Sequence, residues 1–246
     1  MDAMMKGLIQ PDWPAPANIL AFSTSRCAGV STGPWTSLNL GANCGDKKIH
    51  VEQNRSLLND LLPAPAQWMR QVHGTTVLRH RGFPGDEMEG DAMVALKPGR
   101  VCAVLTADCL PVLFCSESGD RVAVAHAGWR GLASGVLQQT IDALDQSPDS
   151  LMAWMGPAIG PGAYEVGEEV TEAFAGEFPA GFKRSGDRYL MDIYALARMK
   201  LEAAGLNAVY GGGFCTLTDE ERFFSYRRDG VTGRMASLIW INAGGN

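Results

Sequence analysis

Three short apolar runs near the centre of the chain constrain its fold more than any other feature. They are rich in valine, are separated by only a few residues, and cover positions 101–107, 111–115 and 121–127. A continuous apolar run can form a buried helix or a buried strand, but short, valine-rich runs favour strands. We therefore expect three buried strands.

Helical and strand patterns alternate in the rest of the sequence. Apolar residues recur at helical spacing in 49–62, 131–146, 168–178 and 191–206, and further strands are expected at 151–156 and 234–242. The first helix is expected to end at Pro63 and the last at Gly205. This alternation predicts an α+β (mixed α/β) fold, with a mixed β-sheet flanked by helices in layers. No repeat or long linker divides the sequence, so we expect a single domain over residues 1–246.

Charge and cysteine usage narrow the class of protein. The formal net charge is −6 and the pI is about 5.2, which argues against a broad basic face for nucleic acid or anionic membranes. No apolar run is long enough to span a bilayer, and the first residues lack the apolar core of a secretory signal. The six cysteines contain no C-x-x-C pair, and we expect reduced thiols in a cytoplasmic protein.

Three short segments carry side chains suited to metal binding or catalysis. They are QVHG (71–74), TADCLPV (106–112) and HAGWRG (126–131), and they place His73, Cys109 and His126 at the edges of apolar runs. Binding groups on layered α/β scaffolds gather at such strand ends. About one strand, one turn and a second strand separate Cys109 from His126, so we expect the two to meet on neighbouring strands. His73 would join them from an adjacent loop.

These residues allow two different chemistries. Two imidazoles and one thiolate would leave one tetrahedral position of a Zn²⁺ ion open, as in catalytic zinc sites, and would lower the pKa of a bound water. Alternatively, Cys109 is a nucleophile and His126 its base, with Asp108 or His73 orienting the imidazole. Taken singly, a cysteine in apolar surroundings is more often an inert core residue. The residues alone leave both chemistries open.

Further segments extend the pattern along the chain. They are SLNLGANCGD (37–46), followed by Asn54-Arg55, then GPAIGP (156–161) and FFSYRRDGVTGRMAS (223–237). Together with the three segments above, they resemble the YfiH family, also described as the laccase-domain or multicopper polyphenol oxidase group. The resemblance runs from about Trp13 to Ile241. Proteins of this family are described as purine nucleoside phosphorylases with adenosine deaminase activity and as peptidoglycan editing factors.

The resemblance implies a YfiH-like fold and a zinc-dependent purine nucleoside phosphorylase. Its substrates would be adenosine, inosine or methylthioadenosine, with phosphate as co-substrate and adenosine deaminase as an accompanying activity. The zinc-binding and catalytic set falls on His73, Cys109 and His126. The candidate substrate-binding residues are Arg26, Arg227 and Arg228 as forks for phosphate, Asn39 for ribose or base, and Asp108 as a proton donor to the purine or as an orienting group.

The sequence departs from the family pattern in two places. Ala28 stands where glycine is common in an Arg-x-Gly-Gly-Val-Ser stretch, and it would add strain if the turn requires a positive φ there. A Gly-Gly-Gly-Phe stretch precedes Cys215 where a more polar segment is usual, so substrate contacts from that loop are in question.

Other functions compete with the phosphorylase. A laccase needs a blue-copper centre and a histidine-rich trinuclear cluster, which four histidines cannot supply, although Cu²⁺ would bind the same ligands adventitiously. A cysteine amidase-type hydrolase that edits peptidoglycan precursors would use Cys109 as nucleophile. A metal-binding or scaffolding protein would instead hold a structural zinc, closed by a fourth protein ligand.

Overall fold

A six-stranded mixed sheet forms the centre of the computed structural model, which describes residues 7–82, 88–174 and 179–243. In spatial order its strands are β11 (Ala208–Gly211), β7 (Leu151–Met155), β5 (Leu110–Ser116), β6 (Val122–Ala127), β3 (Ala92–Ala95) and β2 (Val77–Arg79). The two outermost pairs are parallel, and the inner pairs are antiparallel. The predicted mixed sheet is confirmed.

A second, antiparallel sheet packs against the first. It contains β1 (Ile19–Ser23), β12 (Met235–Ile241) and β4 (Cys102–Thr106). All three central apolar runs are therefore strands, but the first of them lies in a different sheet from the other two. Alternate residues of β5, such as Leu113, point into the layer between the sheets, where they share an apolar cluster with Val104 and Ile239. The continuous apolar character of the central strands follows, because both of their faces are buried.

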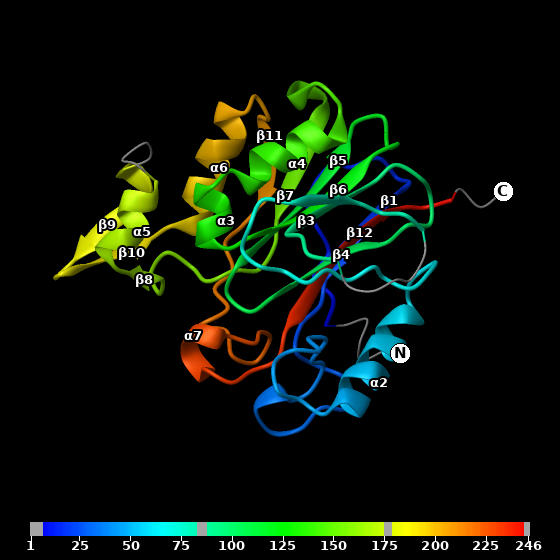
Figure 1. Cartoon of the computed structure of the whole chain (residues 1–246), viewed down its shortest axis with the longest axis horizontal. Helices are drawn as coiled ribbons and strands as arrows, with labels where there is room; N and C mark the ends of the chain where they lie inside the picture. The colour runs from blue at the N-terminus through cyan, green and yellow to red at the C-terminus, as the bar shows by residue number, and fades with distance from the viewer. Residues whose placement is uncertain (1–6, 83–87, 175–178, 244–246) are drawn as a thin grey trace.

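Helices cover the two outer faces, giving four layers (Figure 1). On the six-stranded sheet lie α3 (Trp129–Ala133), α4 (Val136–Leu144) and α6 (Ile193–Ala203), which bury the other face of β5 at Val112 and Phe114. On the three-stranded sheet lies α2 (Lys48–Asn59), whose Leu58 packs with Leu238 and Trp240. The amphipathic spacing found in the sequence thus marks the sheet-facing side of each helix.

The helix boundaries differ from those predicted for local reasons. Segment 131–146 is divided into α3 and α4 because Gly135 adopts φ 95°, which an α-helix cannot continue through. The last long helix begins at Ile193, after Met191 has paired in a strand, and the Asp192 side chain accepts a hydrogen bond from the Ala195 N–H. Gly205, with φ 88°, follows its end as predicted.

A small lobe projects from one end of the main sheet (Figure 1). It contains β8 (Glu165–Val166), β9 (Phe182–Ser185), β10 (Arg188–Met191) and α5 (Glu168–Ala173). The predicted helix over 168–178 corresponds to α5, and its residues 175–178 lie outside the described residues. The short helix α7 (Tyr226–Asp229) lies in the segment between β11 and β12.

None of the described helices has the length and apolar character needed to cross a bilayer. All six cysteines carry free thiols.

The turn at Ala28 and Gly29 lies against α2. Ala28 adopts φ 70°, so the strain expected for alanine at this position is present. At Gly29 the crowding is steric: a Cβ would overlap the Ser37 carbonyl oxygen and the Leu38 Cα, both of which are backbone atoms. The adjacent Val30 N–H donates to the Asn54 side chain of α2, so this close approach fixes the turn against the helix.

Replacing Gly29 with alanine should therefore destabilise the fold. We expect Gly29→Ala to lower the free energy of unfolding by about 1–3 kcal/mol, because backbone must move to admit the methyl group. Gly162→Ala is the matched control: a Cβ there meets nothing within 4 Å, so its effect should stay within about 0.5 kcal/mol. Chemical denaturation of both variants measures the difference, and equal stabilities would contradict the packing described here.

Candidate metal centre and adjoining cavity

The β5–β6 hairpin brings Cys109 and His126 together. Pro111 pairs with His126 across the two strands, and Cys109 immediately precedes β5. His73 approaches from the loop before β2, with its Nε2 atom 3.8 Å from the Cys109 Sγ. The potential ligand atoms of all three residues lie within 4.8 Å of one another. Cys109 and His126 thus lie at the ends of two neighbouring strands that are joined by one turn.

The buried carboxylate of Asp91, directly before β3, fixes two of these residues. Its Oδ1 accepts hydrogen bonds from His126 Nδ1 at 2.8 Å and from the His73 backbone N–H at 2.9 Å. Its Oδ2 accepts from the N–H groups of Val72 and Gly74 at 3.2 and 2.7 Å. Because Nδ1 of His126 is engaged, its Nε2 is the atom left for a ligand.

Asp91 was not among the residues predicted from the sequence, which pointed to Asp108 or His73 as the group that orients His126. The structure gives that task to Asp91, which lies in a different segment, 35 residues from His126. The one signal in the sequence is a Gly-Asp pair at 90–91 that comes directly before the apolar run 92–95. That pattern is too common to single out the residue without its partners.

The Cys109 thiol and the His126 imidazole shift each other's protonation. Burial raises the pKa of Cys109, but the positive charge of His126 and hydrogen bonds from both imidazoles outweigh it and lower the pKa to about 6. Burial lowers the pKa of His126, whereas the Cys109 thiolate and the bond to Asp91 raise it to about 9. Between those two values the metal-free centre therefore holds a thiolate beside an imidazolium.

The three residues fit a tetrahedral metal ion. At the tetrahedral angle, bond lengths of about 2.3 Å to sulfur and about 2.0 Å to nitrogen would separate the sulfur and nitrogen atoms by about 3.5 Å. The observed separation of 3.8 Å between Cys109 Sγ and His73 Nε2 is close to this value. A thiolate with two imidazoles suits Zn²⁺ and also binds Cu²⁺. Among the described residues, this is the one group of three such side chains arranged to share an ion.

Gly128 makes room for the centre. A Cβ at this position would lie 2.6 Å from His73 Cδ2 and 3.2 Å from Cys109 Sγ. The glycine of the HAGWRG segment therefore allows both ligands to approach the backbone at the start of α3. His73 and the neighbouring Asp108 adopt φ values of 61° and 92°, so two residues of this region hold strained backbone conformations.

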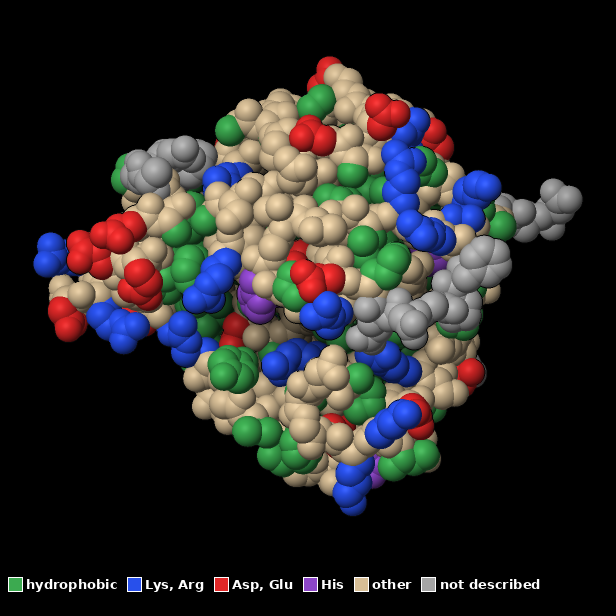
Figure 2. All heavy atoms as spheres, viewed as in Figure 1, with side chains coloured by type: hydrophobic (Ala, Val, Ile, Leu, Met, Phe, Trp, Pro, Cys, Tyr) green, Lys and Arg blue, Asp and Glu red, His purple; other side chains and the backbone are tan. Residues whose placement is uncertain are grey.

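A cavity of about 460 Å³ opens beside the centre. Its lining residues come from seven separate stretches of the chain: Gly41, Ala42, Asn43, Cys44, Arg55, Met69, Arg70, Gln71, His73, Leu105, Thr106, Ala107, Cys109, His126, Tyr226 and Arg234. Three of these are arginines, and the described lining contains no carboxylate. Figure 2 shows Lys and Arg side chains gathered around a hollow in the middle of this face. The cavity is therefore suited to an anionic ligand.

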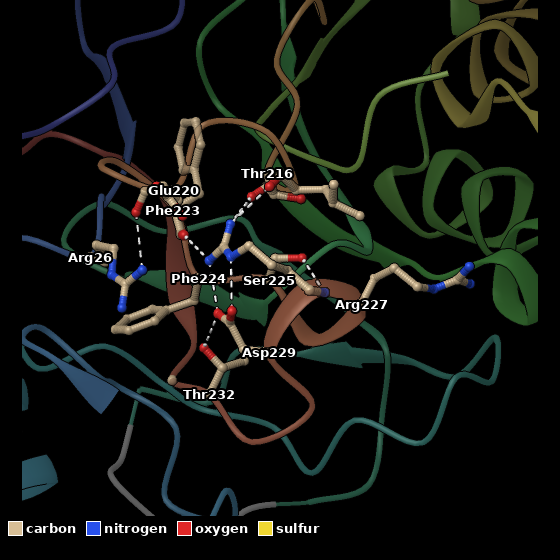
Figure 3. Close-up of polar contacts among 12 residues, drawn as sticks. Arg26, Thr216, Glu220, Phe223, Phe224, Ser225, Arg227, Asp229 and Thr232 are labelled. Carbon is tan, nitrogen blue, oxygen red and sulfur yellow. Dashed lines mark hydrogen bonds and ion pairs between the residues drawn. The ribbon is translucent and has the colours of Figure 1, made fainter. Parts of the chain in front are cut away.

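Two of the predicted phosphate-binding arginines, Arg26 and Arg228, are bonded within the protein and lie outside the described lining of the cavity. The Arg228 guanidinium donates hydrogen bonds to the carbonyls of Thr216, Leu217 and Phe223 and to the Asp229 carboxylate. Arg26 donates to the Thr36 and Glu220 carbonyls and lies over the Phe224 ring. Figure 3 shows Arg26 and Arg227 on opposite sides of this cluster. The structure does not bring the three arginines to one point.

The other predicted site residues also have defined places. Arg227 is exposed, donates to the Glu165 carbonyl and lies over the Tyr164 ring. Asp108 accepts from the Thr216 hydroxyl and from the Arg227 backbone N–H, each at 2.6 Å, and so ties the Cys109 loop to α7. Asn39 is fully buried and bonds Gly41, Cys44, Asp46 and Arg234, which places it behind the loop that lines the cavity.

Comparison with known proteins shows close relatives over nearly the whole chain. The model of a family described as "Multi-copper polyphenol oxidoreductase laccase" matches residues 20–242. The chain is 52% identical over 242 residues to "Purine nucleoside phosphorylase YfiH" of Escherichia coli (strain K12), covering 96% of this chain and 100% of that protein. It is 50% identical over 242 residues to "Purine nucleoside phosphorylase PA4543" of Pseudomonas aeruginosa, covering 96% and 99%.

Solved structures share the fold. Protein NMB0706 of Neisseria meningitidis superposes with a TM-score of 0.94 at 46% identity, covering 96% of this chain and 100% of the other. YlmD of Geobacillus stearothermophilus superposes with a TM-score of 0.90 at 32% identity, covering 96% of each. The α+β architecture predicted from the sequence is thus also the architecture of these proteins.

Crowding at Gly128 predicts a defect in metal binding. We expect Gly128→Ala to weaken Zn²⁺ affinity by about 10- to 100-fold, the range seen when groups that position ligands are disturbed, because the methyl group displaces the His73 ring. Competition with a chromogenic chelator measures the affinity, and Gly162→Ala serves as the control. Unchanged Zn²⁺ affinity in Gly128→Ala would show that His73 is not a ligand in the position described.

The lowered pKa of Cys109 predicts its reactivity when no metal is bound. In chelator-treated protein, alkylation of Cys109 by iodoacetamide should rise with pH around a midpoint near 6, because the thiolate is the reacting form. Cys102 and Cys115 are buried, and burial raises the pKa of both, so they should stay unlabelled in the folded protein. Mass spectrometry of each peptide reports the sites. A midpoint of about 8.5, typical of a free thiol, would contradict the thiolate–imidazolium pair.

Proposed function

We propose that this chain, which belongs to the multi-copper polyphenol oxidoreductase laccase family, is a purine nucleoside phosphorylase with a zinc centre. Several proteins similar to the chain are named purine nucleoside phosphorylase. One observation carries the proposal: the His73, Cys109 and His126 cluster opens into a cavity whose described lining carries three arginines and no carboxylate. A metal centre beside an anion-binding wall suits an enzyme that joins phosphate to a neutral nucleoside.

The reaction transfers a ribosyl group to phosphate. A phosphate oxygen forms a bond to the ribose C1′, the bond from C1′ to the purine nitrogen breaks, and the purine leaves with that electron pair and takes up a proton. Adenosine, inosine and methylthioadenosine are the proposed substrates. The products are the free purine and the sugar 1-phosphate.

The protein's own groups would position both reactants. We assign the phosphate to Arg55, Arg70 and Arg234, because they line the cavity and guanidinium groups match oxyanions in charge and geometry. Each also has a partner in the protein: Arg55 the Leu40 carbonyl, Arg70 the Glu89 carboxylate and Arg234 the Thr232 and Gly233 carbonyls. His73, Cys109 and His126 would hold the Zn²⁺ ion, which supplies a Lewis acid at the open end of the centre. Arg26, Arg228 and Asn39 would contribute through the loops that they hold, and Asp108 through its bond to α7.

Deamination of adenosine is a second proposed activity of the same cavity. Zinc deaminases use a conserved glutamate to move protons during attack on the base. The described lining of this cavity has no carboxylate, so we expect deamination to be slower than phosphorolysis. We place the enzyme in the cytoplasm, because its six cysteines are free thiols.

A cysteine hydrolase is the alternative that one observation favours. The lowered pKa of Cys109 and the raised pKa of His126 describe the ion pair that a nucleophilic cysteine requires. Such an enzyme would act on peptidoglycan precursors through an acyl group on Cys109, and chelators would leave it active. A purely structural zinc fits less well, because the described cluster offers three ligands rather than four. Copper laccase chemistry remains disfavoured, since the two other histidines, His50 and His80, lie outside the cluster.

Products formed from adenosine and inosine test these functions. With Zn²⁺-loaded protein, free adenine or hypoxanthine should appear only when phosphate is present, together with ribose 1-phosphate. Cys109→Ala should lower turnover by at least about 100-fold and release the metal, because it removes the thiolate ligand. Cys27→Ala removes an exposed thiol outside the centre and is the matched control.

The same assay separates the alternatives. Phosphate-independent conversion of adenosine to inosine would identify deamination as the main reaction. Full activity of a metal-free Cys109→Ala protein would overturn the proposed function. Cleavage of a peptidoglycan precursor that survives chelation, with a covalent acyl group on Cys109, would establish the hydrolase instead.

A further inference from the structure

Tyr226 occupies an unusual place for a large aromatic side chain. It is 60% exposed, yet it lines the cavity beside the metal centre. Apart from the imidazoles of His73 and His126, its ring is the one aromatic group in the described lining. An aromatic ring left this exposed gains little from packing within the protein, and its exposed surface is available to a ligand in the cavity.

The backbone that carries Tyr226 is fixed by hydrogen bonds on its C-terminal side. The Ser225 side chain accepts a hydrogen bond from the Arg228 N–H at 3.2 Å and so caps the start of α7. The preceding backbone N–H, that of Arg227, donates to Asp108 at 2.6 Å. Because Asp108 neighbours Cys109 in the sequence, these bonds set the distance from Tyr226 to the metal centre. The ring is thus a pre-positioned surface at the mouth of the cavity.

The surroundings of the ring show what it can bind. The Arg234 guanidinium lies 5.9 Å from the ring centroid, and among the described residues no hydrogen bond engages the Tyr226 hydroxyl. Arg234 also lines the cavity, so a cation lies over the flat aromatic surface there. The ring suits a flat heterocycle, and the guanidinium suits a negatively charged group on the same ligand or on a co-substrate beside it.

We propose that Tyr226 is the stacking platform for the nucleobase and determines the preference for purines. The identity of the base rests on the proposed function, whereas the stacking itself rests on the place of the ring. A bicyclic purine covers more of a phenol ring than a single-ring pyrimidine does, so the platform favours purine nucleosides. Arg234 would then lie toward the phosphate and ribose side of the same ligand.

Two substitutions at Tyr226 and one control test the proposal. Tyr226→Leu keeps an apolar side chain but removes the π-face, and Tyr226→Phe keeps the ring. Val231→Ala alters a side chain that is 54% exposed, follows α7 and does not line the cavity. Binding of adenosine and uridine is measured by calorimetry on Zn²⁺-loaded protein without phosphate. KM and kcat for adenosine, and KM for phosphate, are measured in the same variants.

The expected result is a change in base affinity alone. Tyr226→Leu should raise the Kd and KM for adenosine by about 5- to 150-fold, the range for loss of one base–aromatic stack, and should reduce the preference for adenosine over uridine. It should leave kcat and the KM for phosphate within about threefold. Tyr226→Phe should stay close to the unmodified protein, and Val231→Ala should match it.

Other outcomes overturn the stacking or the function separately. Unchanged adenosine affinity in Tyr226→Leu, or a loss of kcat with KM unchanged, would overturn the platform while leaving the phosphorylase intact. Adenosine binding that depends on Tyr226 in a protein without phosphate-dependent cleavage would instead overturn the proposed function and keep the platform. Absence of any adenosine binding by the unmodified protein would overturn both.

Discussion

The candidate site depends on one buried carboxylate, that of Asp91. It accepts hydrogen bonds from the His126 imidazole and from three consecutive backbone N–H groups, those of residues 72–74. A carboxylate with no exposed surface is costly unless such donors satisfy it. Because the donors belong to two separate segments, neither segment can shift without leaving part of the carboxylate unsatisfied. One interaction therefore fixes the His73 loop against the end of β6.

A second carboxylate extends this arrangement to the wall of the cavity. Asp108 holds a left-handed backbone conformation next to Cys109, and its two oxygens accept from Thr216 and from the N–H of Arg227. These bonds compensate the backbone strain and join the loop that carries the sulfur to α7. The metal centre and the exposed ring of Tyr226 are consequently parts of one connected structure, although more than a hundred residues separate them in the sequence.

The arginines show how the same chemistry can serve two purposes. A guanidinium fork that would suit phosphate also suits a group of backbone carbonyls, and Arg228 uses it in that second way. Arg70 and Arg234 also line the cavity, although Arg70 pairs with Glu89 and Arg234 donates to the Thr232 and Gly233 carbonyls. Neither was selected from the sequence as a phosphate ligand. The choice between these roles depends on which segments surround the side chain. Residue type and local pattern carry no information about that environment.

Local patterns in the sequence determined much of the architecture. The short apolar runs at 111–115 and 121–127 form β5 and β6, and the few residues between them require an antiparallel hairpin, so the meeting of Cys109 and His126 was predictable. Tertiary structure alone decided that the 101–107 run joins a different sheet and that Asp91 meets His126 across 35 residues. Periodicity and turn chemistry act between near neighbours, whereas strand pairing and the burial of a carboxylate depend on contacts that form only when distant segments pack together.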